Sequence, residues 1–429
     1  MQMRGDMLGY LSRMAREYGD IVYLGGWPGG LYLVSDPELI QNILVRDHRN
    51  FHKGRALTVA KRLIGEGLVT SEGDFHRRQR RLVQPAFHRQ RIAAYGDIMV
   101  ALAAQMRARW RDGSEVDIAA EMMRLTLAIV GKTLFNADLE AEAAEIRDAL
   151  TDSMHAFEWM LRPYAPLLQK LPFRVPAVRR FDRARKRLDA VIYRLIDEHR
   201  ANKEDNGDLL SMLLSAHDEE ADGGEMTNDQ VRDEAMTLFL AGHETTSNGL
   251  SWTWYLLAQN PEAESKFAAE IEQVLGGRLP TSEDVASLPY VRAVFAESMR
   301  LYPPVWAVAR RALADYTLGE YEVPAGAIVF ASQHVLHRDP RHFPEPDRFL
   351  PERWLVEPET PRPRFAYFPF GGGPRICIGE SFAWMEGILL LATLGQQWRC
   401  DLMPGQKVTT EPLITLRPKN GIAMRLRKR

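Results

Sequence analysis

Apolar residues spaced three and four positions apart dominate the chain between residues 74 and 275. This spacing gathers apolar side chains on one face of a helix, so it predicts a largely helical segment. The longest helix is expected over residues 227–260, where Thr227 and Gln230 have the spacing of a capping box and Asn260-Pro261 marks the end. At a rise of about 1.5 Å per residue it would be about 50 Å long. Its middle, AMTLFLAG, is apolar on almost every face, which predicts burial all round.

Shorter alternating patterns predict strands near both ends of the chain. IVYLGG and LYLVS flank WPGG, which is typical of two strands joined by a turn. Beyond residue 300, proline-rich segments mix short strands with a long coil that specific contacts must hold. SFAWMEGILLLATLG then returns to helix, and LITLRPKNGIAMRLRKR ends in strands. No repeat or linker divides the chain, so we expect residues 1–429 to form a single domain, mainly α-helical with a minor β region.

Composition and charge narrow the class of protein. Of the 429 residues 45% are hydrophobic and 26% charged, and the net charge of −2 indicates no bias toward nucleic acid or anionic membranes. Two cysteines argue against a disulfide scaffold and suit a reducing compartment. No apolar run reaches the roughly 18–20 residues that span a bilayer, and the N-terminus lacks a secretory signal. We therefore expect a cytoplasmic protein without a membrane span.

Two types of catalytic site, that of a serine hydrolase and that of a zinc hydrolase, are suggested by short sequence patterns but are not supported by the residues around them. GESFA at residues 379–383 half resembles the nucleophile elbow of serine hydrolases, but no histidine follows Ser381. HETTS at residues 243–247 begins like a zinc-binding H-E-x-x-H motif, but Ser247 stands where the second ligand belongs. The two cysteines have no histidine nearby, which excludes a zinc site built on them. GGGPR lacks the Lys-Ser/Thr ending of a phosphate loop.

A third constellation surrounds Cys377, which follows three glycines, an arginine and an isoleucine and precedes an apolar helix. Backbone N–H groups at the start of a helix favour a thiolate. The neighbouring glycines would let the backbone approach a large flat ligand without Cβ clashes. A thiolate bound to haem iron suits these features, with Phe370 shielding the sulfur and Arg375 reaching an anionic substituent. The alternative is a buried, inert cysteine.

Phe370-x-x-Gly373-x-Arg375-x-Cys377-x-Gly379 resembles the haem-binding signature of the cytochrome P450 superfamily at each of its five defining positions. The resemblance implies the cytochrome P450 fold, in which the long helix lies over haem b and Cys377 is the axial ligand of the iron. Further matching motifs run from about residue 75 to residue 380 and extend the resemblance to essentially the whole chain. We therefore expect one haem domain with no fused reductase.

AGHETTS at residues 241–247 resembles the oxygen-activation segment of the same family. The resemblance implies that Ala241 and Gly242 border the haem and that Thr245 and Glu244 relay protons to bound oxygen. A glycine inside a helix costs about 1 kcal/mol relative to alanine. The presence of Gly242 therefore suggests room for a ligand and a local opening of the helix. The alternative is that the threonines simply bond to the preceding turn.

A charge network is implied by Glu297-x-x-Arg300 and by Arg353 in PERW, which resemble the family's lock on the coil before the cysteine. Taken alone, Glu297 and Arg300 would be an ordinary surface ion pair of little energetic value. Trp354 stands where phenylalanine is commoner in the family. We assign the three charged residues a structural role, because they could hold the long coil over residues 303–370.

The basic stretch at residues 76–91 contains His76-x-x-x-Arg80, which resembles the family's pair of haem-propionate contacts. Arg310 resembles a further propionate-binding arginine, with Arg311 as an adjacent competitor. Three other arginines remain for solvent or a partner: Arg77, Arg78 and Arg81. A solvated face or a nucleic-acid patch is the alternative, and we prefer a docking surface for an acidic electron-transfer protein.

The resemblance implies an oxidoreductase, a monooxygenase that uses O2 to hydroxylate a hydrophobic small molecule. Electrons would come from a separate ferredoxin, flavodoxin or flavoprotein reductase, and we expect a monomer that binds no nucleic acid. Another class of protein remains possible on the sequence: a haem-thiolate gas or redox sensor, which would need Cys377 but no proton relay.

By analogy with the family, apolar residues would line the substrate pocket, and the same residues could equally be core. They are Leu68, Val69, Phe239, Val305, Val308, Leu413 and Ile414. AGHETT and HRDP…PERW look more like the branch that includes fatty-acid hydroxylases than like the camphor-type enzymes. A fatty acid or similar lipid is therefore the first expected substrate, and a terpenoid or steroid the second.

Overall fold

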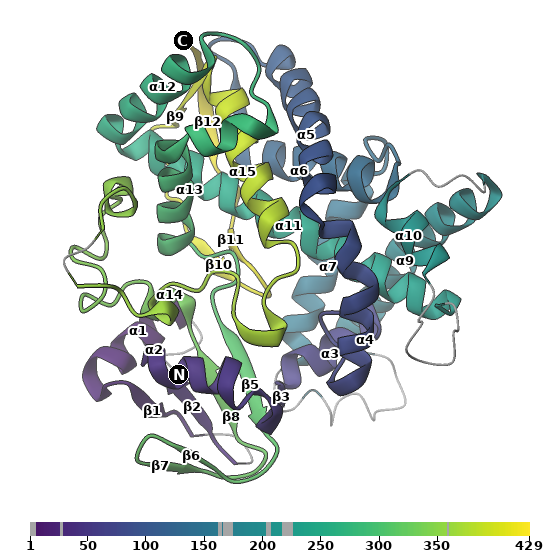
Figure 1. The fold of residues 1–429 in the computed structure, drawn as a ribbon, viewed down its shortest axis with the longest axis vertical. Helices are drawn as coiled ribbons and strands as arrows, with labels where there is room; N and C mark the ends of the chain where they lie inside the picture. The colour runs from purple at the N-terminus through teal and green to yellow at the C-terminus, as the bar shows by residue number, and fades with distance from the viewer. Residues whose placement is uncertain are drawn as a thin grey trace. The chain divides into compact units, whose positions relative to one another are not determined.

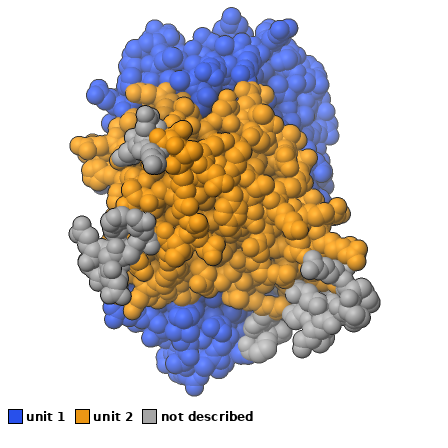
Figure 2. Space-filling view, turned by 90° about the vertical axis from the view of Figure 1, so that its right-hand side faces the viewer, with its two compact units in different colours: residues 1–54, 99–122, 245–429 blue, residues 55–98, 123–244 orange. Residues whose placement is uncertain are grey.

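The structure is a computed structural model that describes residues 6–25, 29–161, 165, 175–202, 207–216, 226–357 and 360–429. Its helices and small sheets confirm the expectation of a mainly α-helical fold with a minor β region (Figure 1). The chain forms two compact units, coloured separately in Figure 2. Unit 1 combines residues 1–54, 99–122 and 245–429, and unit 2 combines residues 55–98 and 123–244. The single haem domain stays a prediction.

Unit 1 contains a five-stranded sheet with the strand order β1-β2-β8-β5-β3. β1 (Ile21–Tyr23) and β2 (Leu31–Val34) form the antiparallel pair expected around WPGG, and the intervening residues 26–28 lie outside the described residues. β2 runs parallel to β8 (Ile328–Ala331). β5 (Val308–Ala312) is antiparallel to β8 and to β3 (Phe51–Lys53), so segments far apart in the sequence meet in this sheet (Figure 1).

Both faces of the five-stranded sheet are covered. Leu33 packs with Leu11 of α1 (Met7–Tyr18), whereas the adjacent Val34 packs in a second cluster with Ile40. Successive strand residues point to opposite faces, and both Leu33 and Val34 are fully buried. Asp6 is the N-cap residue of α1, and its carboxylate accepts a hydrogen bond from Gly9 N at 2.9 Å.

Among the described residues of unit 1 there are three smaller sheets, and they confirm the strands expected at the C-terminus. β12 (Ala423–Lys428) lies between β4 (Glu115–Asp117) and β9 (Trp398–Leu402). The two hairpins are β6 (Tyr316–Leu318) with β7 (Tyr321–Val323), and β10 (Thr410–Pro412) with β11 (Leu416–Pro418).

The α-helices of unit 1 include α15, which matches the apolar helix expected after Cys377. Besides α1, the α-helices that lie wholly in unit 1 are α2 (Pro37–Gln41), α12 (Pro261–Leu275), α13 (Pro289–Leu301), α14 (Gln333–Leu336) and α15 (Glu380–Gly395). Its short 3-10 and π turns are η2 (Asn42–Arg46), η3 (His48–Asn50), η5 (Ser282–Ser287), η6 (Pro351–Trp354), η7 (Arg364–Ala366) and η8 (Gly373–Arg375).

Unit 2 is helical over its described residues. Its elements are α3 (Arg55–Ile64), α4 (Gly73–Val83), η4 (Gln84–Phe87), α7 (Ala143–Met160), α9 (Pro176–Asn202) and α10 (Leu209–Ser215). Salt bridges border the packing of α7 on α9, with Arg194 Nη2 2.7 Å from Glu142 Oε1 and Arg187 Nε 3.1 Å from Glu145 Oε1. Three helices have residues in both units: α5 (Arg89–Arg109), α6 (Ile118–Phe135) and α11 (Asn228–Gln259).

α11 begins and ends where its sequence signals stand. Thr227 N donates to Gln230 Oε1 at 2.8 Å, and Gln230 N donates to Thr227 Oγ1 at 3.3 Å, which forms the expected capping box. The next helix starts at Pro261, directly after Asn260. The helix includes residues 241–247, and the local opening expected beside Gly242 stays a prediction.

A buried histidine–aspartate pair in unit 2 joins the end of α9 to the start of α10. His199 Nε2 lies 3.0 Å from Asp208 Oδ2, and His199 Nδ1 lies 2.9 Å from the Leu195 carbonyl oxygen. A carbonyl and a carboxylate both accept hydrogen bonds, so this geometry suits a histidine that carries a proton on each nitrogen. The hydrogen bond with Asp208 raises the pKa of His199. Burial opposes ionisation of Asp208, but hydrogen bonds from His199 and Ser211 hold its pKa below the usual value.

We expect His199→Gln to lower stability mainly under mildly acidic conditions, by about 1–3 kcal/mol for a lost charge-assisted hydrogen bond. A raised pKa adds stability below the unfolded value of about 6.5, and this stability is lost as pH rises through the folded pKa. The difference in melting temperature between wild type and variant should therefore shrink from about pH 5.5 to pH 8.5. Melting curves that differ equally at all these pH values would contradict the charged pair.

Candidate functional site

Cys377 lies in unit 1, in the turn between η8 and α15. Its backbone N–H donates to the Phe370 carbonyl at 3.0 Å, and the Ile376 N–H donates to the Gly373 carbonyl at 3.0 Å. The Cys377 side chain is exposed. Cys400, by contrast, is 2% exposed, and burial raises the pKa of its thiol. The two cysteines therefore have opposite environments, and Cys377 presents the accessible sulfur.

The glycines before Cys377 have packing reasons that the sequence does not reveal. Gly373 has a φ of +66°, and a Cβ there would lie 2.0 Å from the Leu44 carbonyl oxygen. A Cβ on Gly372 would lie 2.4 Å from the Phe365 ring. These two glycines are thus required by the packing of the loop on its own unit, besides any ligand. Gly379 is the N-cap residue of α15.

The loop before Cys377 is anchored at two points of unit 1. Tyr367 OH donates to the Ala296 carbonyl on α13 at 3.0 Å, and Phe368 N donates to His337 Nε2 at 3.0 Å. Burial and the neighbouring positive charge of Arg300 hold the pKa of His337 well below its usual value, so its Nε2 can accept this bond. These contacts tie the approach to the cysteine to α13 and to the C-terminal end of α14.

Glu297, Arg300 and Arg353 form one buried network. Arg300 donates to both oxygens of Glu297, from Nε at 2.9 Å and from Nη2 at 2.8 Å, and Arg353 Nε donates to Oε1 at 3.0 Å. Neither Glu297 nor Arg300 has any solvent exposure. The pair is therefore not the surface ion pair that its spacing alone would indicate.

The network extends into the coil between α14 and η6. Leu350 N donates to Glu297 Oε1 at 3.0 Å, and Trp354 Nε1 donates to Oε2 at 2.8 Å. Arg300 donates to the carbonyl oxygens of His337 at 2.8 Å and Arg348 at 3.0 Å. The indole N–H explains the tryptophan at position 354, a contact that sequence reasoning missed because it noted only the departure from phenylalanine.

In the middle of α11, one face of the helix is less buried than the others. Ala241 is exposed, and Gly242 and Thr245 are half-buried, whereas residues 235–239 and 246–254 are buried. Ala241 and Thr245, four residues apart, lie on the same face of the helix, and Gly242 lies about 100° from Ala241 around the helix axis. This less buried face departs from the all-round burial predicted for the helix, and it coincides with the segment that resembles the oxygen-activation motif.

The two candidate proton-relay residues differ in environment. Glu244 is buried and Thr245 is half-buried, and consecutive helix residues point about 100° apart. His243 beside them is fully buried and its pKa is lowered by that burial to about 4, so it is neutral. Gly242 has a packing reason, since a Cβ there would lie 2.9 Å from Val130 Cγ2.

The candidate propionate contacts lie partly in each unit. In unit 2, His76 is buried and Arg80 half-buried on one face of α4, while Arg77 and Arg81 are exposed. In unit 1, Arg310 is half-buried on β5 and the adjacent Arg311 is exposed, as expected for neighbours on opposite faces of a strand. This difference favours Arg310 over its competitor.

Arg375 and the candidate substrate-pocket residues differ in their exposure. Arg375 is half-buried in η8. Leu68 and Phe239 are buried, and Phe239 packs against Phe135 with ring centroids 5.8 Å apart. The remaining pocket candidates are at least partly open: Val69, Val305, Val308, Leu413 and Ile414.

Glu386, which the sequence did not single out, is a buried acid on α15. Burial raises its pKa to about 8, and a hydrogen bond with Thr246 only partly offsets this. At neutral pH the group is therefore mainly protonated. An isolated glutamate in an apolar helix carries no spacing signal, so sequence reasoning could not have distinguished it from a surface residue.

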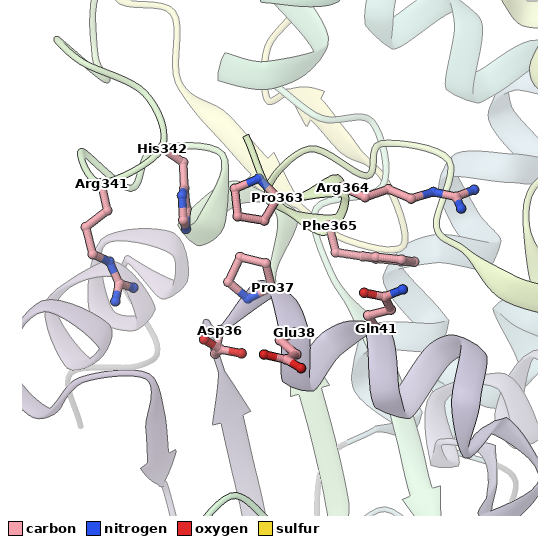
Figure 3. A pocket seen from close by; sticks show the side chains of 9 residues that line it. All are labelled: Asp36, Pro37, Glu38, Gln41, Arg341, His342, Pro363, Arg364 and Phe365. Atoms are coloured by element: carbon pink, nitrogen blue, oxygen red, sulfur yellow. The ribbon is translucent and has the colours of Figure 1, made fainter. Parts of the chain in front are cut away.

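A groove of about 380 Å³ lies elsewhere in unit 1, where α2 meets the chain around Arg341 and Phe365. Figure 3 shows Asp36 and Glu38 of this groove on one side and His342 on the other. None of its lining residues is a candidate site residue, so it does not mark the proposed chemistry.

Comparison with known proteins decides the family. A family model described as Cytochrome P450 matches residues 1–424. The chain belongs to the cytochrome P450 family. Its cofactor is accordingly haem b, and its activity is that of a P450 monooxygenase. Along the described residues, no helix combines the length with the hydropathy that a bilayer span requires.

Three relatives of this P450 come from Streptomyces. Cyclooctatin synthase of Streptomyces melanosporofaciens is 42% identical over 402 residues, which cover 93% of this chain and 87% of the relative. Cyclooctat-9-en-7-ol 5-monooxygenase of the same organism is 40% identical over 397 residues, or 90% and 84% of the two chains. Pentalenene oxygenase of Streptomyces avermitilis is 33% identical over 431 residues, or 100% and 94%.

The residues of this P450 fit haem b within each unit. In unit 1 the exposed sulfur of Cys377 is a donor that suits iron, and Arg310 and Arg375 are half-buried cations of the kind that bind carboxylates. In unit 2 His76 and Arg80 share a helix face and could bind a carboxylate in the same way.

We expect Glu297→Ala to destabilise the P450 by about 3–5 kcal/mol, because it leaves Arg300 and Arg353 without their buried counter-charge. Arg348→Ala is the matched control, since Arg348 forms an exposed ion pair with Glu345 in the same coil. The control should change stability by less than about 1 kcal/mol. Thermal unfolding and haem retention would measure both effects. Equal losses in the two variants would contradict a central role for the network.

Proposed function

We propose that this P450 hydroxylates a terpenoid, using O2 and electrons from a separate redox partner. The observation that carries the proposal is the set of relatives, whose names describe the oxygenation of cyclooctat-9-en-7-ol and pentalenene and the synthesis of cyclooctatin. They favour the second substrate class expected from the sequence over the first.

The fatty-acid expectation rested on AGHETT and on HRDP…PERW. Gly242 packs on Val130, and Arg353 and Trp354 bind Glu297. Because these residues pack the scaffold, their resemblance to one branch carries little information about the substrate. The apolar pocket candidates suit a terpenoid as well as a lipid.

Cys377 would hold the haem iron through its sulfur. Arg310 and Arg375 in unit 1, and His76 and Arg80 in unit 2, would each be candidate contacts for the propionates. Haem b bound through a thiolate supplies the activation of O2 and the transfer of one oxygen atom. Support comes from the exposed position of Cys377 and from the half-buried positions of the arginines.

We assign Thr245 the delivery of protons from its hydroxyl oxygen, because its side chain lies on the less buried face of α11. Glu244 would replenish that proton from its buried position, in line with the general acid chemistry of carboxyl groups. Ala241 presents only a methyl group on the less buried face, which leaves space for a flat cofactor, whereas the side-chain position of Gly242 faces Val130.

Electron delivery would use the outer face of α4. Arg77 and Arg81 are exposed there, and Arg77 Nη2 lies 3.1 Å from Asp74 Oδ1 in a salt bridge that is itself exposed. An exposed basic face attracts an acidic protein through long-range electrostatics.

The alternative function, a non-catalytic haem-thiolate sensor, is not favoured, because relatives are named as oxygenases.

The direct experiment is a substrate screen with the haem-loaded enzyme. Cyclooctat-9-en-7-ol and pentalenene would be compared with palmitic acid, in binding titrations of the haem absorbance and in turnover with a surrogate ferredoxin, reductase and NADPH. We expect a spectral shift and a product one oxygen atom heavier with at least one terpenoid. Turnover of the fatty acid alone would contradict the proposed substrate class.

We expect Thr245→Ala to lower the yield of product per electron consumed by about tenfold or more, because the proton-delivering hydroxyl is removed. Thr253→Ala is the matched control, since the Thr253 hydroxyl donates to the Gly249 carbonyl within the same helix at 2.7 Å. Product and NADPH consumption would be measured together in both variants. An unchanged yield in Thr245→Ala would exclude the proposed role of the hydroxyl.

A further inference from the structure

The chain between α3 and α4, residues 65–72, is fastened to the second turn of α11 by three consecutive side chains, Arg232, Asp233 and Glu234. Glu66 N donates to Asp233 Oδ2 at 2.7 Å, and Leu68 N donates to Glu234 Oε2 at 3.0 Å. Arg232 Nη2 donates to the carbonyl oxygen of Leu63, at the end of α3, at 2.8 Å. We call these three residues the α11 latch; both partners of every bond lie in unit 2.

Two glycines let the loop approach the helix this closely. Gly65 has a φ of +64°, and a Cβ there would lie 1.9 Å from Asp233 Oδ1. A Cβ on Gly67 would lie 2.2 Å from Thr237 Oγ1 and 2.5 Å from the Asp233 carbonyl oxygen. The Gly-Glu-Gly sequence of the loop is therefore matched to the side chains of the second and third turns of α11.

The latch is itself held in place. Arg232 donates to Asp233 Oδ1 at 2.8 Å and, through Nε, to Asp189 Oδ1 on α9 at 2.9 Å. Arg232 and Glu234 are both buried. Thr70 Oγ1 donates to the Gly65 carbonyl at 2.6 Å and so closes the loop on itself. These contacts hold the carboxylates of Asp233 and Glu234 in orientations in which they accept hydrogen bonds from the backbone N–H groups of the loop.

The hydrogen bond that Leu68 N donates to Glu234 determines which side chains of the following residues face inward. With its amide held on α11, Leu68 turns its side chain inward and is 7% exposed, whereas Val69 is 36% exposed. Both residues belong to the proposed lining of the substrate pocket. A shift of the loop by one residue would exchange the side chain that is presented.

We propose that Asp233 and Glu234 are positioning residues that determine which atom of the substrate is hydroxylated, by fixing Leu68 and Val69. The inference rests on the proposed function in one respect, that this loop lines the substrate pocket. Glu234 is buried and Asp233 is half-buried, and a buried carboxylate contributes little net stability compared with an apolar side chain of similar volume. The placement of these two carboxylates opposite two backbone N–H groups is better explained by the definition of one loop conformation.

The first test is hydrogen exchange in the substrate-free, haem-loaded enzyme. Asp233→Ala and Glu234→Ala should speed exchange of the peptide covering residues 64–71 by about tenfold or more, because each removes a charge-assisted hydrogen bond to its backbone. Asp233→Asn and Glu234→Gln keep an acceptor oxygen and should restore most of the protection. Asp229→Ala, at an exposed position in the first turn of α11, is the matched control. Unchanged exchange in the alanine variants would overturn the latch.

The second test is the ratio of hydroxylated isomers formed from the compound that the enzyme turns over in the screen. Asp233→Ala, Glu234→Ala and Gly67→Ala should each change this ratio by about threefold or more, since all three displace the same loop. Asn and Gln at positions 233 and 234 should return it toward wild type, and Asp229→Ala should leave it unchanged. An unchanged ratio with faster exchange would overturn the positioning role.

The two proposals can fail separately. If only the fatty acid is hydroxylated, the terpenoid proposal is wrong, and the isomer ratio from the fatty acid still tests the latch. If a terpenoid is hydroxylated and the latch variants leave its isomer ratio unchanged, the proposed function stands and the latch proposal is wrong.

Discussion

The buried carboxylate of Glu297 is the interaction on which the arrangement of the cysteine loop depends. Five N–H donors surround it: two from Arg300 and one each from Arg353, Leu350 and Trp354. A desolvated carboxylate is strongly unfavourable unless its hydrogen bonds are satisfied. Three of the donors come from the coil, so the coil cannot move away from α13 without leaving that charge unpaired. Tyr367 then ties the chain before Cys377 to the same helix, which gives the exposed sulfur a defined position.

Local signals predicted the regular elements well, and the structure places α11 within one residue of each expected end. Capping and proline signals act within a few residues, so the sequence carries them directly. The buried state of Glu297 and Arg300 could not be predicted, because their spacing equally describes a surface pair. The packing constraints that require glycine at positions 372 and 373 could not be predicted from the sequence either, because Phe365 and Leu44 contact these positions only in the folded chain.

Candidate site residues can be proposed from the sequence where several neighbours repeat a family pattern, and much less so where a single side chain acts from a distance. Glu386 is surrounded by apolar residues in sequence, and only its burial shows that it is a neutral acid near neutral pH. Asp233 and Glu234 resemble surface charges in the first half of a long helix. Their contacts with Glu66 and Leu68 join residues more than 160 positions apart, and no local pattern records such a contact.

We expect Cys377, which its anchored loop holds in an exposed position, to bind the haem iron. The most direct test is the absorbance spectrum of the reduced protein with and without carbon monoxide, for wild type, Cys377→Ser and Cys400→Ser. We expect a strongly red-shifted thiolate-type Soret band in wild type and in Cys400→Ser, and its loss in Cys377→Ser. A red-shifted band that persists in Cys377→Ser, or a wild-type protein that binds no haem when haem is supplied, would contradict it.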